Sequence, residues 1–360
     1  MKDNYALIMA GGIGSRFWPI SRTAFPKQFI DILGTGKTLI QHTYERFLKI
    51  LPAENIFIVT NEAYVDLVKE QLPQLDENQI LAEPIMRNTA PCIAYGCHKI
   101  YKLNPDACIV VAPSDHLIVD NESFVESIKQ SLQTASTHDC LLTLGIKPSR
   151  PDTGYGYIQF NSATIDESFY KVKTFTEKPN LELARAFVQS GEFLWNAGIF
   201  VWSAKNILQA FANYLPEIND VFKEGNLVYN TSREQEFIQA AYYQCTNISI
   251  DYGIMEKADN VYVLPADFGW SDLGTWASVY ELSEKDYVGN AVTPSDRVIM
   301  YDSSNCIVNV PENKLVVLQG LHDYIVVEDN NTLLICPRDQ EQDVRRIVTD
   351  VKQRFGTDFI

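Results

Sequence analysis

Residues 9–19 read Met-Ala-Gly-Gly-Ile-Gly-Ser-Arg-Phe-Trp-Pro and follow directly on the short apolar run 5–9. Glycines placed after a buried strand let backbone N–H groups approach phosphate oxygens, because no Cβ stands in the way. The dinucleotide-binding pattern Gly-x-Gly-x-x-Gly is not met, since its third glycine, counted from Gly12, would fall at Phe17. The stretch therefore predicts a strand followed by a phosphate-binding loop of another kind.

Short apolar runs alternate with longer helix-like segments through the first half of the chain. The strand-like runs are 5–9, 56–60, 108–112 and 140–145, and the helix-like segments are 39–51, 63–72 and 123–137. Alternation of this kind predicts a mostly parallel sheet wrapped by helices. Ligands bind such sheets beyond the carboxyl ends of the strands, so we expect the chemistry just after Met9 and Ala112.

The pattern becomes mixed from about Gly154 and changes again beyond Glu284. Strand-like runs 155–160, 172–177 and 193–201 alternate with helix-like segments 181–190 and 233–243. Short β-rich runs follow at 298–301, 306–310, 314–319, 324–327 and 332–336, and then an amphipathic helix over 340–355. We expect an α/β fold over residues 1–284, with a Rossmann-like, mixed and mainly parallel sheet flanked by helices. Residues 285–360 are expected to form a small β-rich domain ending in a helix, with a left-handed β-helix as one option.

The charge of the chain argues against two classes of partner. Its 30 Lys and Arg against 46 Asp and Glu give a net charge of -16, so nucleic acid or an anionic membrane would be repelled. A phosphate site must therefore be a local group of basic residues. The seven cysteines are scattered without a Cys-x-x-Cys pair, which is typical of reduced thiols. We expect a cytoplasmic protein without a leader or a membrane span.

Arg16 and Lys27 are the candidate basic residues of the glycine-rich loop. Arginine can clamp phosphate oxygens through two N–H groups, and lysine offers a point charge. Lys27 stands in the run Phe-Pro-Lys-Gln-Phe (25–29), where its neighbours are mostly apolar. The alternative is that the glycines form an ordinary strand-to-helix turn and that both cations are solvated surface charges.

Motifs through roughly the first 280 residues carry a resemblance. They include Gly-Gly-x-Gly-x-Arg-x-x-Pro (11–19), Ser-Arg (21–22), Pro-Lys-Gln-Phe (26–29), Arg-Asn-Thr-Ala-Pro (87–91), Pro-Ser-Asp-His (113–116), Glu-Lys-Pro (177–179), Trp-Asn-Ala-Gly (195–198) and Trp-Ser-Asp-Leu-Gly-Thr-Trp (270–276). Together they resemble the mannose-1-phosphate guanylyltransferases of the sugar nucleotidyltransferase superfamily. The resemblance implies transfer of GMP from GTP to mannose 1-phosphate, which gives GDP-mannose and pyrophosphate.

The resemblance also implies a role for each matching residue. Arg16 and Lys27 would grip the nucleotide phosphates as catalytic residues, and Asp115 and Asp272 would hold Mg²⁺. The predicted nucleotide-binding residues are Gly11, Gly12, Gly14, Ser15, Glu83, Asn88 and Thr89. The predicted sugar-phosphate-binding residues are Gly156, Glu177, Lys178, Asn196, Gly198 and Asp251.

Several of these residues have a plain structural alternative. Asp115 could be a turn aspartate and Asp272 a helix N-cap, and Asn88 with Thr89 makes a good helix start. Glu177 and Lys178 could be a solvated charged turn. The amide of Asn196 is more informative, because a polar side chain within an apolar run must find partners.

Three further expectations concern activity and assembly. A pyrophosphorylase of another specificity and a non-catalytic subunit that binds GDP-mannose are the rival functions. Some family members carry an additional isomerase domain, but His322 stands alone in the tail, so we expect the short form without isomerase activity. The tail resembles the small β-helical domain that some relatives use in dimer contacts, and this resemblance makes a homodimer the expected assembly.

Overall fold

The computed structural model describes residues 3–12, 14–294 and 296–360, and the chain forms two compact units. Unit 1 comprises the chain up to Gly11 together with Tyr44–Ser114 and Ile118–Trp270. Unit 2 comprises Gly12–Thr43, Asp115–Leu117 and Ser271–Ile360. The glycine-rich loop from Gly12 onward therefore packs in the same unit as the C-terminal β-rich segment. The domain boundary expected after residue 284 stays a prediction, because each unit is assembled from several separate segments of the chain.

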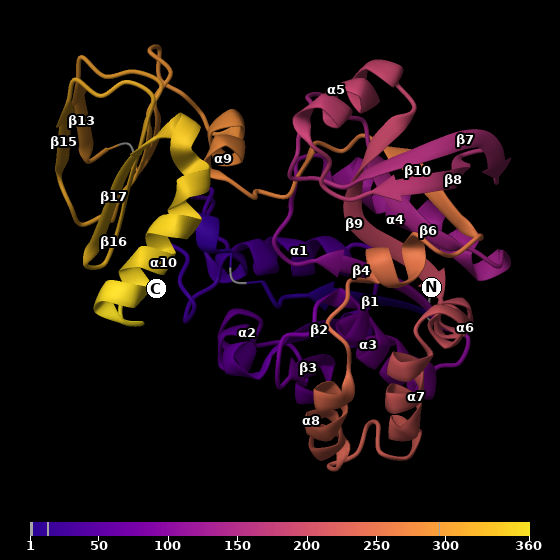
Figure 1. Cartoon of the computed structure of the whole chain (residues 1–360). Coiled ribbons are helices and arrows are strands. Elements are labelled where there is room, and N and C mark those ends of the chain that lie inside the picture. Colours follow the sequence, from indigo (N-terminus) through magenta and orange to yellow (C-terminus); the bar gives the residue numbers. More distant parts are fainter. Residues whose placement is uncertain (1–2, 13, 295) are drawn as a thin grey trace. The chain divides into compact units, whose positions relative to one another are not determined.

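A mixed sheet of nine strands runs through unit 1, in the order β3-β2-β1-β4-β9-β6-β10-β8-β7 (Figure 1). Neighbours from β3 to β4 pair in parallel, as do β6 and β10, whereas β9 pairs antiparallel with both β4 and β6. The expected mixed α/β fold is confirmed. The strands are β1 (Asn4–Met9), β2 (Ile56–Asn61), β3 (Ile80–Glu83), β4 (Cys108–Pro113), β6 (Leu141–Ile146), β7 (Tyr157–Ile165), β8 (Phe169–Thr176), β9 (Phe193–Ser203) and β10 (Val261–Ala266).

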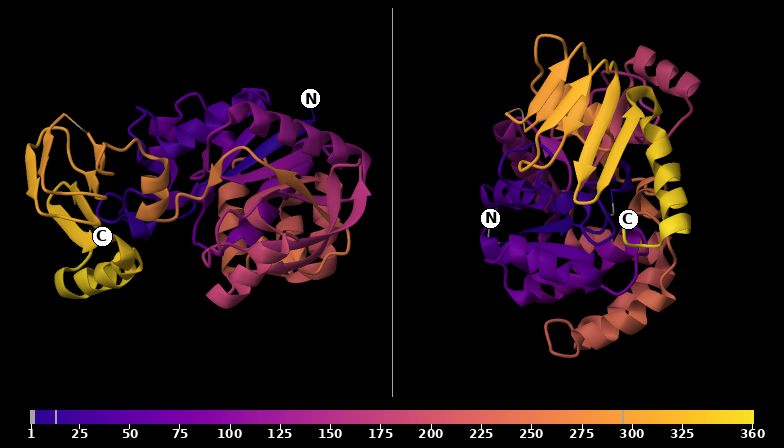
Figure 2. Two further views of the ribbon diagram at one scale, coloured as in Figure 1. Left: turned by 90° about the horizontal axis from the view of Figure 1, so that it is seen from above. Right: turned by 90° about the vertical axis from the view of Figure 1, so that its left-hand side faces the viewer.

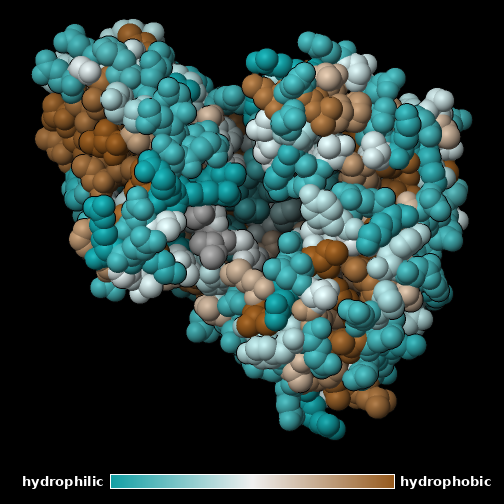
Figure 3. Space-filling view, in the orientation of Figure 1, coloured by the Kyte–Doolittle hydropathy of each residue, from teal (hydrophilic) through white to brown (hydrophobic). Residues whose placement is uncertain are grey.

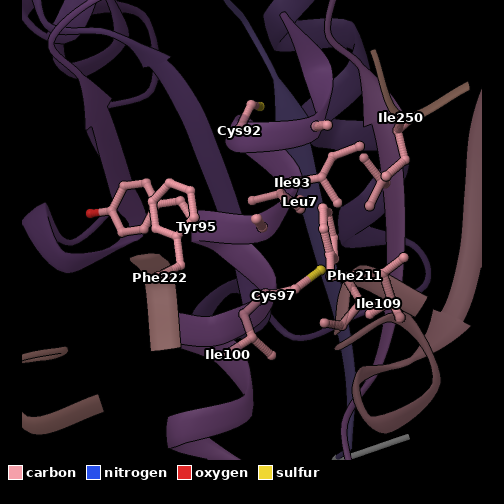
Figure 4. Packing of buried hydrophobic residues seen from close by; sticks show 14 of the residues in the cluster. Leu7, Cys92, Ile93, Tyr95, Cys97, Ile100, Ile109, Phe211, Phe222 and Ile250 are labelled. Atoms are coloured by element: carbon pink, nitrogen blue, oxygen red, sulfur yellow. The ribbon is translucent and has the colours of Figure 1, made fainter. Parts of the chain in front are cut away.

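Helix α3 (Thr89–Leu103) shows how closely the helices pack on this sheet. A Cβ at Gly96 would lie 2.4 Å from Leu7 Cδ2, so only glycine allows this approach of α3 to β1. Ile93 and Cys97 of α3 lie in the same buried cluster as Leu7 of β1 and Ile109 of β4 (Figure 4). The other α-helices of unit 1 are α2 (Val65–Gln71), α4 (Asn121–Thr137), α5 (Leu181–Ser190), α6 (Ala204–Tyr214), α7 (Pro216–Glu224) and α8 (Glu234–Gln244). Helix α1 (Leu39–Leu48) and the paired strands β5 (Leu117–Ile118) and β11 (Trp270–Ser271) contain three of the five points where the chain passes between the units. The other two follow Gly11 and Ser114.

The C-terminal part of unit 2 is built from two small sheets of mainly parallel strands. One has the order β12-β14-β16-β17 and the other pairs β13 with β15. Ile307 pairs with Ile325 and Val298 with Val316, so β14–β16 and β13–β15 pair at the same sequence spacing, as successive turns of a β-helix do. The expected β-helix-like domain is confirmed. The strands are β12 (Ala291–Thr293), β13 (Val298–Tyr301), β14 (Ile307–Asn309), β15 (Val316–Gln319), β16 (Tyr324–Asp329) and β17 (Thr332–Pro337).

The last helix begins later than the sequence suggests. Helix α10 (Val344–Phe355) lies along β16 and β17 (Figure 2), and the preceding residues form the 3₁₀ turn η8 (Arg338–Asp343). The expected start at Gln340 is wrong, because the backbone there has φ -106° and ψ 16°, outside the helical range.

The hydrophobic core of unit 2 joins the glycine-rich loop to the C-terminal segment. Phe17 packs edge-on against Trp276, the first residue of α9 (Trp276–Leu282), with ring centroids 5.2 Å apart. Trp18 lies in the same buried cluster as Ile325 of β16 and Val344 of α10. All seven cysteines are buried free thiols. None of the helices in the described residues is long and apolar enough to cross a membrane.

Candidate active site

Lys27 is a buried residue at the centre of a polar cluster in unit 2. Its Nζ lies 2.8 Å from Asp115 Oδ2 and donates hydrogen bonds to the main-chain oxygens of Asp272 (2.7 Å) and Leu273 (3.2 Å). An ammonium has three N–H donors, so each has an acceptor. Lys27 is 4% exposed, which rules out the alternative of a solvated surface charge.

The backbone around Lys27 explains part of the glycine pattern. Gly14 has φ +65°, and a Cβ there would lie 2.5 Å from Lys27 Cβ, so this glycine makes room for the lysine. Apart from its two chain neighbours, no described residue has an atom within 4 Å of a Cβ added at Gly12, so there is space for a ligand on that side of Gly12. Leu273 also has a positive φ of 44°, an uncommon conformation for a residue with a side chain. Ser15 belongs to the 3₁₀ turn η1 (Ser15–Phe17), and its side chain lies outside the described residues.

Arg16 also lies in unit 2, and one nitrogen of its guanidinium makes a hydrogen bond within the protein. Nη1 donates a 3.3 Å hydrogen bond to the main-chain oxygen of Gly274. Its Nε is buried and has no hydrogen-bond acceptor among the residues that the structure describes. A buried donor without an acceptor is costly, and an anion bound at Arg16 would remove that cost.

Asp115 and Asp272 lie on two segments that contact the same ammonium. Burial opposes ionisation of Asp115, but the Lys27 charge and His116, whose Nε2 is 3.9 Å away, outweigh it and lower the pKa of the carboxyl. Asp272 Oδ1 accepts a 2.9 Å hydrogen bond from Gly274 N, and the N-cap of α9 is Thr275. The alternative of Asp272 as the helix N-cap is therefore wrong.

The carboxylates of Asp115 and Asp272 suit a metal cation that takes its remaining ligands from substrate and water. No group of three His, Cys, Asp or Glu side chains able to hold a metal occurs within the described part of the chain. Mg²⁺ is commonly bound by one or two carboxylates, with substrate phosphates and water completing its shell. Asp115 and Asp272 fit that requirement in number and in chemistry.

A second polar cluster lies in unit 1 around Asn196 of β9. Its Nδ2 donates to Asp251 Oδ1 at 2.7 Å, and its Oδ1 accepts from Gly198 N at 3.0 Å. Gly156 O accepts from Asn196 N at 2.8 Å, and a Cβ at Gly156 would lie 2.6 Å from Glu177 Oε2. Burial raises the pKa of Asp251, while the Asn196 amide opposes that shift. The structure thus brings five of the six predicted sugar-phosphate residues into one cluster, and Lys178 joins them through its contact with Glu177.

Lys178 differs from these five because it is largely exposed. Its Nζ lies 2.6 Å from Glu177 Oε1, and 61% of its side chain is accessible. Exposed pairs of this kind contribute little to stability. The description as a solvated charged turn therefore fits Lys178 alone, whereas Glu177 also contacts the Asn196 cluster.

Glu83, Asn88 and Thr89 lie at the end of β3 and the start of α3. Asn88 is the N-cap, and its Oδ1 accepts from Thr89 N at 2.9 Å, as the helix-start interpretation expects. Thr89 Oγ1 accepts from Ile250 N at 2.9 Å, immediately before Asp251. Glu83 is 5% exposed, and a Cβ at Gly11 would lie 3.5 Å from its Oε2.

The Glu83 carboxyl gives a pH-dependent expectation. Burial raises its pKa from 4.5 to about 7, so folding favours the protonated form. This contribution to stability is fully present below pH 4.5 and is lost as the pH rises through about 7. Glu83→Gln should therefore be more stable than the wild type by on the order of 3 kcal/mol at pH 8 and equal to it at about pH 4. Denaturant unfolding at both pH values, with the exposed Glu236→Gln as control, checks this; an equal difference at both pH values would contradict it.

Comparison with known proteins decides the family. Residues 5–288 match the model of the Nucleotidyl transferase family, and residues 296–351 match the MannoseP isomerase/GMP-like beta-helix domain. The chain belongs to the nucleotidyl transferase family. A Klebsiella pneumoniae protein named mannose-1-phosphate guanylyltransferase is 36% identical over 98% of this chain and 75% of its own length.

Two solved structures resemble this nucleotidyl transferase. One, named mannose-1-phosphate geranyltransferase, from Thermus thermophilus, superposes with a TM-score of 0.86 and 31% identity over 98% of this chain and 100% of that one. Another, named mannose-6-phosphate isomerase, from Helicobacter pylori, gives 0.61 and 25% over 75% of this chain and 99% of that one. The protein is a nucleotidyltransferase enzyme, and its family generally uses a divalent metal.

Proposed function

We propose that the protein transfers GMP from GTP to α-D-mannose 1-phosphate, giving GDP-mannose and pyrophosphate. The observation that carries the reaction type is the buried ammonium of Lys27, held against Asp115 in a glycine-rich loop where Gly14 packs against the lysine. The guanine and mannose specificity is supported by the names of relatives such as the Klebsiella pneumoniae protein.

The reaction is a single displacement at phosphorus. An oxygen of the mannose 1-phosphate attacks the α-phosphorus of GTP, the bond to the oxygen bridging the α- and β-phosphorus breaks, and that oxygen leaves with pyrophosphate. No protein nucleophile is needed. The phosphate groups repel one another, so the protein contributes positioning and positive charge through Arg16 and Lys27, with Lys178 as a further cation for the sugar phosphate.

We propose Mg²⁺ as the metal, with Asp115 and Asp272 as its protein ligands. When bound, it would neutralise negative charge on the nucleotide phosphates and on the leaving pyrophosphate. We assign the nucleotide to Gly11, Gly12, Gly14 and Ser15 of the loop, with Glu83, Asn88 and Thr89 for the base. The N–H donors that guanine presents would favour the ionised form of the Glu83 carboxyl, which burial alone disfavours.

Asn196 provides a test of the sugar assignment. Asn196→Ala removes a hydrogen bond to the Asp251 carboxylate and should raise KM for mannose 1-phosphate about tenfold or more, with KM for GTP nearly unchanged. Steady-state kinetics with each substrate varied in turn measures the effect. Asn213→Ala, at an exposed asparagine of the same unit, is the control. A rise confined to the GTP KM would contradict the assignment.

A substrate panel tests the proposed specificity. Pyrophosphate release is measured with Mg²⁺ for GTP, UTP, dTTP, ATP and CTP, each with mannose 1-phosphate and with glucose 1-phosphate. We expect release mainly from GTP with mannose 1-phosphate. Preference for another combination of nucleotide and sugar phosphate would overturn the proposed specificity but would still support nucleotidyl transfer as the reaction. No release from folded protein that still binds GDP-mannose would favour the non-catalytic subunit.

The same preparation tests the isomerase alternative that the Helicobacter pylori structure's name raises. We expect no interconversion of fructose 6-phosphate and mannose 6-phosphate. Measurable interconversion by the pure protein would contradict this expectation.

The proposed assembly is a homodimer formed through the β-rich segment of unit 2. An apolar area covers the strands labelled β13 and β15 in Figure 1 (brown in Figure 3). Its side chains are at least 43% exposed and include Ile299, Tyr301, Leu315 and Val317. Exposed apolar patches commonly mark protein interfaces. Light scattering should give twice the chain mass of 40.8 kDa and a lower mass for Val317→Asp, whereas a monomeric wild type would contradict the dimer.

A further inference from the structure

Arg22 connects the glycine-rich loop to the C-terminal strands within unit 2. Its Nε donates to Pro19 O at 3.1 Å, and its Nη2 donates to Asp329 O at 3.0 Å and lies 3.2 Å from Asp329 Oδ2. The two side chains are 14% and 31% exposed. Asp329 is the last residue of β16, so one guanidinium joins the turn at Pro19 to the β16–β17 hairpin.

The loop needs side-chain contacts to keep its shape. The described residues of 12–38 contain only short 3₁₀ turns and one isolated bridge, from Arg22 to Phe25, and no α-helix or β-strand. Backbone hydrogen-bond ladders therefore do not fix the positions of Arg16 and Lys27. Ordering such a segment costs conformational entropy, which its contacts must offset.

Two other contacts connect the C-terminal segment to the rest of the unit, one to the glycine-rich loop and one to helix α9. Trp18 Nε1 donates a 2.6 Å hydrogen bond to Phe359 O near the C-terminus. Glu341, in the turn before α10, accepts from Ala277 N at 2.9 Å in the first turn of α9. Helix α9 follows the segment whose carbonyls hold Lys27 and Arg16. The C-terminal segment thus contacts the glycine-rich loop that carries Lys27 and the helix α9 that follows Asp272 and Leu273.

We propose that Arg22 and Asp329 are a positioning pair for nucleotidyl transfer, through which the C-terminal β-rich segment holds Arg16 and Lys27 in place. The inference rests on the proposed function. Neither residue need touch a substrate, and the pair acts on the rate because catalysis by positioning is sensitive to small displacements of the charged groups. The C-terminal segment then supports the reaction itself, in addition to any role in assembly.

The test compares variants of the full-length protein. Asp329→Ala should lower kcat about tenfold, and KM for mannose 1-phosphate should change less than about twofold. Asp329→Asn keeps a hydrogen-bond acceptor for Arg22, so its kcat should fall less than that of Asp329→Ala. Arg22→Ala combined with Asp329→Ala should be no slower than Arg22→Ala alone, because the two residues act as one unit. Asp343→Asn, which changes an exposed pair with Arg346 at 3.5 Å, is the control and should leave kcat unchanged.

The outcomes separate the possible failures. A merely structural pair would lower the melting temperature of Asp329→Ala while kcat at 25 °C stays that of the wild type, and this would overturn the inference. Additive losses in the double variant would also overturn it. A wild type without GDP-mannose formation would instead show that the proposed function fails. If Arg22→Ala does not fold, the graded pair Asp329→Ala and Asp329→Asn still decides the question.

Discussion

Lys27→Met is expected to lower kcat about 100-fold or more, the order of loss seen when one preorganised charge stabiliser is removed. Methionine approximates the length of the side chain but lacks the ammonium that contacts Asp115 and two main-chain carbonyls. The loss should appear in kcat because the charge on the phosphates changes during the reaction. Steady-state kinetics of pyrophosphate release measures it.

The control for this variant is Lys69→Met. Lys69 also pairs with a carboxylate, Glu77, at 2.6 Å, but its side chain is 43% exposed. Its replacement should leave kcat and stability almost unchanged. Lys27→Met should in addition be destabilised by about 1–3 kcal/mol, because the acceptors around it lose their donor. Wild-type turnover in a folded Lys27→Met protein would remove Lys27 from the mechanism.

Asp115→Asn is expected to have a loss of similar size, about 100-fold in kcat, together with a need for more Mg²⁺. The amide keeps the shape of the side chain and an acceptor for Lys27, so the change isolates the negative charge. The pKa of Asp115 is lowered against the effect of burial, and the carboxylate is therefore ionised throughout the neutral range. Titration of activity with Mg²⁺ should show a raised half-saturating concentration.

Asp106→Asn is the matched control, since Asp106 pairs with Lys205 at 2.7 Å and is 77% exposed. A loss of kcat in Asp115→Asn without any change in the Mg²⁺ requirement would argue against the metal-ligand role. The combined loss in Lys27→Met with Asp115→Asn should be smaller than the sum, because the two charges contact each other.

The sequence predicts the strands with clear local signals. The run 5–9 corresponds to Asn4–Met9, and 298–301 matches β13, because continuous apolar runs bounded by turn residues mark strands whatever their partners are. The strand β3 is not among the predicted strands, because the apolar run in Ile80–Glu83 ends after three residues and leads into Glu83 and Pro84. The place of β9 beside β4 and β6 depends on pairing over long sequence distances, which local patterns do not carry.

The candidate site was predictable where residue types carry the chemistry. Arg16, Lys27, Asp115 and Asp272 could be named because charged side chains stand after strands or within matching motifs. The hydrogen bonds to the main-chain oxygens of Asp272, Leu273 and Gly274 could not be predicted, because every residue carries such an oxygen and the sequence does not mark which ones are used. The packing of residues 12–43 with the C-terminal segment, and with it the role of Arg22, likewise depends on tertiary contacts.

The most direct test of the account is the product of one incubation. Purified protein with Mg²⁺, GTP and mannose 1-phosphate should form GDP-mannose and pyrophosphate in equal amounts, as measured by anion-exchange chromatography and a pyrophosphate assay. Release of GMP or phosphate without GDP-mannose, or no turnover by folded protein, would contradict the proposed transfer.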